Sequence, residues 1–184
     1  YQHVTKPDGE EELPFYLCLG NHDYGLSHNP LKKGFLKDNS QVQVDYSKVS
    51  KKWNMPSKWY MKSFDNCDFF FLDTNMDRLK MTEIEAQLEY MVHEIKQSKN
   101  RWKILCGHHT WRSVGGHGNA KSDMPRFEQF MKDLLLQVRI DLYVCGHDHC
   151  KSIIEVGRDK IPTLVIGTGG KKYDEHLYFP KNMD

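Results

Sequence analysis

Six of the ten histidines in this 184-residue chain lie in or just beyond three short segments of similar composition. Each segment begins with a glycine that follows an apolar run: Gly-Asn-His-Asp at 20–23, Gly-His-His at 107–109 and Gly-His-Asp-His at 146–149. Imidazole is the commonest metal ligand in proteins, so the segments predict a metal site built from several loops. The candidate residues are His22, His108, His109, His117, His147 and His149.

The donor types indicate which metals such a site would take. The amide oxygen of Asn21 suits hard ions and imidazole suits transition metals, so the mixture favours Fe, Zn or Mn over Ca or Mg. In an extended segment, side chains two residues apart point the same way, so His147 and His149 could both reach a metal while Asp148 points away. One metal takes about four protein ligands, and this many candidate donors suggests two metals.

Each segment also has a simpler interpretation. Residues 20–23 could form an Asx turn, and Gly-His-x-His alone could be an ordinary strand end. We expect His109 to line the site rather than to bind metal. The other four histidines are assigned to the surface or to loops: His3, His28, His93 and His176. The order of the three segments along one chain is what favours the metal site.

The elements that position these segments follow from hydrophobic periodicity. Helices are expected at 41–53, from Thr82 (with Glu85 in a capping box) to about residue 97, and from about Pro125. This alternation predicts an α/β layered domain whose sheet faces are covered by helices, with ligands at the carboxyl ends of the strands. Short apolar runs predict strands at 15–19, 59–64, 67–73, 102–106, 141–145, 152–156 and 163–166.

Composition and charge exclude several classes of protein. Lysine and arginine number 26 and aspartate and glutamate 25, which argues against a broad nucleic-acid surface and predicts no nucleic-acid partner. No stretch approaches 18 apolar residues, so this chain is expected to hold no transmembrane segment. The five cysteines are scattered and form no Cys-x-x-Cys pair, which argues against a disulfide framework and a sulfur-bound metal.

The three histidine segments resemble the later motifs of the calcineurin-like metallophosphoesterases: Gly-Asn-His-Asp, Gly-His and Gly-His-x-His, in this order. Residues 107–118 and 45–60 are also similar to the purple acid phosphatases, particularly the small tartrate-resistant class. The likeness runs from about Leu13 to Gly170. It implies a layered metallophosphoesterase-type β-sandwich flanked by helices, and acid phosphatase-like hydrolysis of phosphoric monoesters.

The resemblance also implies a dinuclear centre. Asn21, His108 and His147 would bind the divalent metal, and His149 would bind the other metal, which is ferric in the purple enzymes. The cofactors would be two metal ions, Fe plus Fe, Zn or Mn. A metal-bound hydroxide would attack a phosphate ester substrate.

Two further histidines would act on the substrate, again by resemblance. His22 would protonate the leaving oxygen or stabilise its charge, and His117 would steady the phosphoryl oxygens. Asp23 is placed to orient the ring of His22, as carboxylates often do for functional histidines.

The first two motifs of the family, Asp-x-Gly or Asp-x-His and then Gly-Asp-x-x-Tyr, are not found in this sequence. Only 19 residues precede Gly20, Asp8-Gly9 is a poor match, and Asp73 comes after the third motif. We therefore expect residues 1–184 to be one domain, the C-terminal portion of a longer catalytic domain that is incomplete at its N-terminus and its C-terminus. Two or three metal ligands would be missing from this chain, and the N-terminal part would be supplied in cis or as a second chain.

Two other functions remain open. A phosphatase-like protein with a degenerate site would act as a scaffold or binding module. A structural zinc module held by histidines would bind one metal and lose its fold on chelation. The compartment is open as well: the resemblance suggests secretion or an acidic vesicle, whereas the cysteines and the lack of Asn-x-Ser/Thr sequons do not support it.

Overall fold

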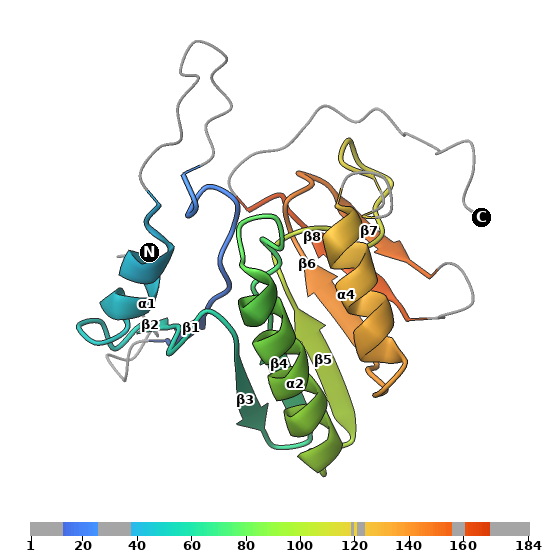
Figure 1. Cartoon of the computed structure of the whole chain (residues 1–184), viewed down its shortest axis with the longest axis horizontal. Coiled ribbons are helices and arrows are strands. Elements are labelled where there is room, and N and C mark those ends of the chain that lie inside the picture. The colour runs from blue at the N-terminus through green and yellow to red at the C-terminus, as the bar shows by residue number, and fades with distance from the viewer. Residues whose placement is uncertain (1–12, 26–37, 119, 121–123, 156–160, 170–184) are drawn as a thin grey trace.

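The computed structural model describes residues 13–25, 38–118, 120, 124–155 and 161–169. Helices and strands alternate through most of this part of the chain (Figure 1). In chain order the elements are β1 (Phe15–Tyr16), α1 (Ser40–Tyr46), β2 (Trp53–Asn54), β3 (Tyr60–Phe64), β4 (Cys67–Phe71), α2 (Met81–Gln97), β5 (Trp102–Cys106), α4 (Pro125–Leu135), β6 (Leu142–Cys145), β7 (Lys151–Ile154) and β8 (Thr163–Ile166).

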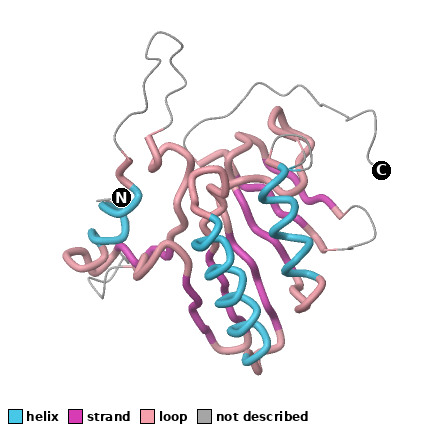
Figure 2. The backbone as a smooth tube through the Cα atoms, in the orientation of Figure 1, coloured by secondary structure: helices cyan, strands magenta, loops and turns pink. Residues whose placement is uncertain are grey.

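One six-stranded sheet organises the molecule, in the order β3-β4-β5-β6-β8-β7. The four inner strands are parallel, and the edge strands β3 and β7 pair antiparallel with their neighbours. Connections through α2 and α4 join the inner strands, and both helices lie over the same face of the sheet (Figures 1 and 2). The carboxyl ends of β5 and β6 therefore meet at one edge, where two of the histidine segments begin. The expected α/β layered class is confirmed.

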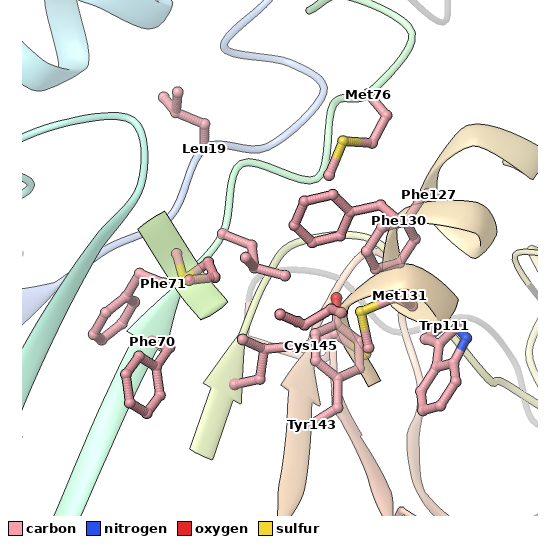
Figure 3. Close-up of a cluster of buried hydrophobic side chains, with 14 of the residues drawn as sticks. Leu19, Phe70, Phe71, Met76, Trp111, Phe127, Phe130, Met131, Tyr143 and Cys145 are labelled. Carbon is pink, nitrogen blue, oxygen red and sulfur yellow. The ribbon is translucent and has the colours of Figure 1, made fainter. Parts of the chain in front are cut away.

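The core lies between this sheet and its two helices (Figure 3). Phe70, Leu105 and Tyr143 come from three adjacent strands and are fully buried. Phe127 and Met131, on the inner face of α4, are also fully buried. Their helical spacing is the one that the sequence predicts for an amphipathic helix against a sheet.

The opposite face of the sheet is also apolar. By the alternation of strand side chains it carries Phe69, Ile104 and Val144 in its middle. No described helix covers it, and Trp102 and Ile153 at its margins are 44% and 77% exposed. Half-buried apolar side chains over several strands are typical of a surface that packs against another layer.

The helix expected at 41–53 is wrong in its second half, because α1 ends at Tyr46. The chain then turns, and Ser47 Oγ donates to the carbonyl of Met55 and accepts from its amide at 2.9 and 2.8 Å. Trp53 lies in β2, which pairs in parallel with β1. Its indole packs back onto α1, which preserves the periodicity that suggested a longer helix.

The start of α2 also differs from the expectation. The helix begins at Met81, and its capping residue is Lys80 instead of Thr82. The carboxylate of Glu83, rather than that of Glu85, accepts from the amide of Lys80 at 3.0 Å. The spacing of the capping box is as expected, but shifted by two residues.

None of the described helices is long and apolar enough to cross a bilayer. All five cysteines are free thiols, as the sequence suggested. Burial raises the pKa of Cys106 and of Cys145 to about 12, so these thiols are protonated at neutral pH.

Candidate metal centre

The loops that follow β5 and β6 are bonded to one another at the carboxyl edge of the sheet. The amide of Gly107 donates to the carbonyl of Val144 at 3.0 Å, and the amide of Gly146 donates to the carbonyl of His108 at 3.1 Å. These backbone bonds hold His108 and His147 at fixed positions. The segment 20–23 reaches the same place, because Asn21 contacts His108.

Three of the expected metal ligands converge there. Asn21 Oδ1 lies 2.8 Å from His108 Nε2, and His147 Nδ1 lies 3.0 Å from that same nitrogen. Asn21 is 87 positions from His108 in the sequence, so the tertiary fold creates this contact. A Cβ atom on Gly20 would lie only 3.2 Å from the ring of His108, which explains the glycine before the asparagine.

His109 joins this group, although the sequence suggested that it only lines the site. The ligand atoms of His108, His109 and His147 all lie within 4.8 Å of one another. His109 is buried, and its Nδ1 lies 2.8 Å from Thr74 Oγ1. The hydroxyl of Tyr143 donates to its carbonyl at 2.6 Å, so the position of the ring is fixed from two sides.

His149 does not belong to this group, and the extended Gly-His-x-His geometry is wrong. His147 has a φ of 63°, in the left-handed region, so the segment bends instead of extending. Asp148 is fully buried and binds the segment that carries His117. It accepts from the hydroxyl of Ser113, and its Oδ1 accepts from the amide of His117 at 2.9 Å.

The two residues expected to act on the substrate flank this group. The ring of His117 lies 4.0 Å from that of His147, centroid to centroid. His22 is exposed at the turn that also holds Asn21, and its charge influences His108. The carboxylate of Asp23 accepts from the amide of Gly20 at 2.8 Å and closes that turn. Its expected contact with the His22 ring stays a prediction.

Burial keeps the central rings uncharged. It lowers the pKa of His108 to about 4, helped by the neighbouring His22, His117 and His149. It also lowers the pKa of His109 to about 2, helped by His108, although the bond with Thr74 acts in the opposite direction. Neutral imidazole is the form that binds metal.

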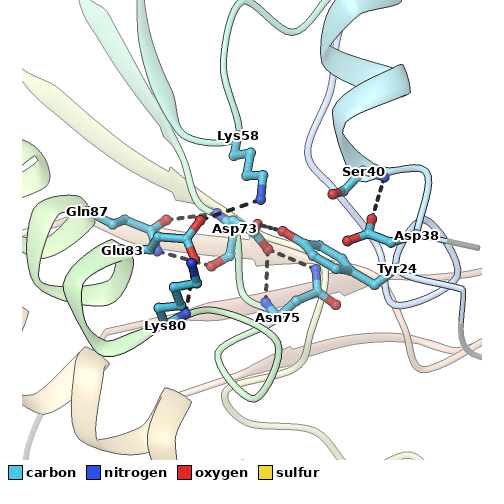
Figure 4. Close-up of polar contacts among 9 residues, drawn as sticks. All are labelled: Tyr24, Asp38, Ser40, Lys58, Asp73, Asn75, Lys80, Glu83 and Gln87. Carbon is cyan, nitrogen blue, oxygen red and sulfur yellow. Dashed lines mark hydrogen bonds and ion pairs between the residues drawn. The ribbon is translucent and has the colours of Figure 1, made fainter. Parts of the chain in front are cut away.

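Asp73 and its partners connect the turn of Asn21 to the sheet, a function that sequence reasoning missed. Asp73 follows β4 and is fully buried, and it accepts from the hydroxyl of Tyr24 at 2.5 Å (Figure 4). It also accepts from Asn75, whose side chain donates to the carbonyl of Leu19 at 3.3 Å. Burial raises the pKa of Asp73. A carboxylate directly after an apolar strand is the available sequence signal, although Asp73 follows the third motif and so does not match the order of the family's motifs.

The donors fit a metal ion. Nitrogens about 2.1 Å from a tetrahedral metal are about 3.4 Å apart, and the two separations around His108 Nε2 are somewhat shorter. A small outward movement of the rings would admit an ion between an amide oxygen and two or three imidazoles. His93 is 67% exposed on α2, as assigned, whereas His3, His28 and His176 lie outside the described residues.

Comparison with known proteins identifies a family for this chain. Residues 2–151 match the family model described as Metallophos, calcineurin-like phosphoesterase. Purple acid phosphatase 4 of Arabidopsis thaliana is 28% identical over 185 residues, which are 88% of this chain and 49% of that protein. Tartrate-resistant acid phosphatase type 5 of Rattus norvegicus is 27% identical over 169 residues, 81% of this chain and 47% of that protein. The chain spans about half the length of the curated relatives it matches.

Two solved structures share the fold. Purple acid phosphatase PPD1 from yellow lupin (Lupinus luteus) seeds superposes with a TM-score of 0.61 at 19% identity, over 90% of this chain and 32% of that one. GAP50, described as the anchor in the inner membrane complex of Plasmodium, superposes with a TM-score of 0.63 at 19% identity, over 94% of this chain and 56% of that one.

Proposed function

Because the chain belongs to the calcineurin-like phosphoesterase family, we propose that its strand-end loops form part of a dinuclear centre that hydrolyses phosphoric monoesters, as an acid phosphatase does. The observation that carries this proposal is the convergence of Asn21 Oδ1 and His147 Nδ1 on His108 Nε2. These donors come from three separate loops, and a hydrogen-bonded core of this kind has the donor chemistry of a transition-metal site.

In this proposal Asn21, His108 and His147 hold one metal, and His149 contributes to the second. The metals would be Fe plus Fe, Zn or Mn. When bound, two adjacent cations lower the pKa of water and balance the charge of the phosphate. His109 fixes the geometry around them through its bonds to Thr74 and Tyr143.

The substrate would be held and cleaved with the help of His117 and His22. His117 has its backbone fixed by Asp148 and its ring next to that of His147, which suits it to donate to phosphoryl oxygens. His22 is exposed on the same edge, where it can protonate a departing alkoxide.

We also propose that the chain is the C-terminal portion of a longer catalytic domain. Its span of about half the length of its relatives supports this, and so does the apolar sheet face that no described helix covers. A further layer on that face would supply the carboxylate ligands of the first two family motifs, which are not found in this sequence. The coding sequence before Tyr1 tests the idea: an Asp-x-Gly and a Gly-Asp-x-x-Tyr motif are expected there.

A degenerate site in a scaffold protein is the second candidate. The likeness to GAP50 supports it, because that protein has the same fold and is described as an anchor and not as an enzyme. It predicts that a protein with both halves of the domain binds its partner without turnover.

Hydrolysis of p-nitrophenyl phosphate separates these candidates. A protein that carries the upstream motifs should turn it over, and His22→Ala should lower kcat about a hundredfold, the usual contribution of a general acid. His93→Ala, an exposed histidine away from the site, is the matched control and should change nothing. No turnover with both metals bound would contradict the phosphatase proposal. Ordinary enzymatic rates from residues 1–184 alone would contradict the missing-ligand proposal.

A further inference from the structure

A basic hollow lies at the end of the sheet opposite to the histidines. Its volume is about 490 Å³, and residues from the C-terminal end of α2 and from the segment that follows α4, at the bottom of Figure 1, line it. Arg101 and Lys103 reach it at the start of β5, whereas His108 follows the end of that strand. A strand of five residues spans roughly 17 Å, so the hollow is separate from the metal centre.

Cations dominate its lining. Lys96, Arg101, Lys103 and Arg139 surround it, and Asp141 is the one carboxylate among its lining residues. The whole chain carries a formal charge of only +1, so this concentration is local. Such a site attracts anions small enough to enter it.

Lys96, Arg101 and Arg139 are exposed, whereas Lys103 Nζ already donates to the carbonyl of Asn100 at 2.9 Å. Asp141 Oδ2 accepts from the backbone amide of Lys103 at 2.8 Å, so the carboxylate is already engaged. The guanidinium of Arg101 stacks over the Trp102 ring, 4.9 Å from its centroid. Within the described part of the chain, no salt bridge involves Lys96, Arg101 or Arg139.

Stabilisation of the helix ends explains only part of this arrangement. Lys96 lies in the last turn of α2, where a cation offsets the helix dipole. Arg101 and Lys103 come after that helix, and Arg139 follows α4. Three separate elements therefore direct positive charge into the same space.

Two apolar residues, Ile95 and Val138, also line the hollow. Ile95 is 3% exposed, and Val138 is half-buried. The volume lies in the range of small-molecule sites, although most of the lining residues here are polar or charged. Arginine binds phosphate through paired hydrogen bonds, and several cations favour a dianion over a carboxylate. We propose that this hollow binds a small molecule in which a phosphate-type dianion is joined to an apolar body.

Phenylphosphonate is a suitable probe, because its carbon–phosphorus bond resists ester hydrolysis. Calorimetric titration of the full chain should detect binding, and the double variant Arg101→Ala/Arg139→Ala should weaken it about tenfold or more. Lys99→Ala removes an exposed cation from the same loop outside the hollow and should leave the affinity unchanged. His108→Ala should leave it unchanged as well, which keeps this test independent of the metal centre. Melting temperatures of the variants verify that they fold.

Four results would overturn the proposal. The first is no binding of phenylphosphonate by the unmodified chain. The second is an equal loss of affinity in Lys99→Ala, which would indicate diffuse electrostatic attraction, and the third is a loss of affinity in His108→Ala, which would place the probe at the metal centre. The fourth is equal affinity for methylphosphonate. Equal affinity for methylphosphonate would contradict the proposed contact of the apolar body with Ile95 and Val138, because a methyl group reaches little of these two side chains.

Discussion

A single carboxylate on α4 holds the loop that carries His117. Glu128 is buried, and its Oε2 accepts from the indole of Trp111 at 2.9 Å and from Arg112 at 2.8 Å. Burial alone would raise the pKa of Glu128, but Arg112, Trp111 and Lys132 outweigh it, and the pKa is lowered. This carboxylate therefore contributes to stability in its charged form.

Glu128→Gln should lower the free energy of unfolding by about 1.5–3 kcal/mol at pH 7, because the charge of Arg112 loses its partner. A lowered pKa in the folded state means that the stabilisation is complete above the pKa of the unfolded chain, about 4.5, and disappears as the pH falls through the folded value. The difference between variant and unmodified chain should thus shrink in acid. Urea unfolding at pH 7 and pH 4 measures both effects. Glu85→Gln, an exposed change on α2, should cost less than about 0.5 kcal/mol; equal losses in the two variants would contradict this account.

Residue types and order were enough to predict much of the site. Asn21, His108 and His147 were expected together and lie together. The placement of His149 could not be predicted, because it depends on the left-handed backbone of His147, which alternation in an extended strand does not anticipate. The participation of Asp73 depends on contacts with distant residues, which no local pattern contains.

At the scale of elements, the end of β8 packs against the turn between β6 and β7. A Cβ atom on Gly167 would lie 1.7 Å from the carbonyl oxygen of Asp148, which is backbone and cannot rotate away. This glycine therefore fixes the position of the turn that presents His147. Within the described part of the chain, Gly169, two residues later, has nothing within 4 Å of such an atom.

Gly167→Ala should therefore destabilise the protein by about 1–3 kcal/mol or more, as overpacking does, whereas Gly169→Ala should leave it nearly unchanged. Thermal unfolding of the two variants makes the comparison. Similar melting temperatures for both variants would show that the turn between β6 and β7 can move to accommodate a methyl group, which would contradict the close packing.

The long, strongly periodic elements were predictable, and their boundaries were less so. The inner strands and the helices α2 and α4 follow from apolar spacing that matches one buried face. The error at α1 has a physical cause, because Trp53 packs back onto the helix from a strand and so continues its apolar period. Hydrophobic periodicity indicates which side chains are buried together, but it does not determine the path of the backbone between them.

At the scale of the whole molecule, the two ends of the sheet differ in chemistry. The carboxyl edge of the inner strands gathers histidines, and the opposite end gathers cations around a hollow. The near-zero net charge conceals this separation. We propose that this chain supplies one layer of a longer domain and part of its metal centre, and the apolar sheet face and the greater length of the relatives support this proposal.

Titration of the chain with Zn²⁺ by calorimetry tests the central claim, that His108 is the focus of a metal site. We expect one weak Zn²⁺ site, with an affinity at least about tenfold lower in His108→Ala and unchanged in His93→Ala. Removal of the metal by a chelator should leave the circular dichroism spectrum unchanged. Equal affinity in His108→Ala and the unmodified chain would contradict the central claim.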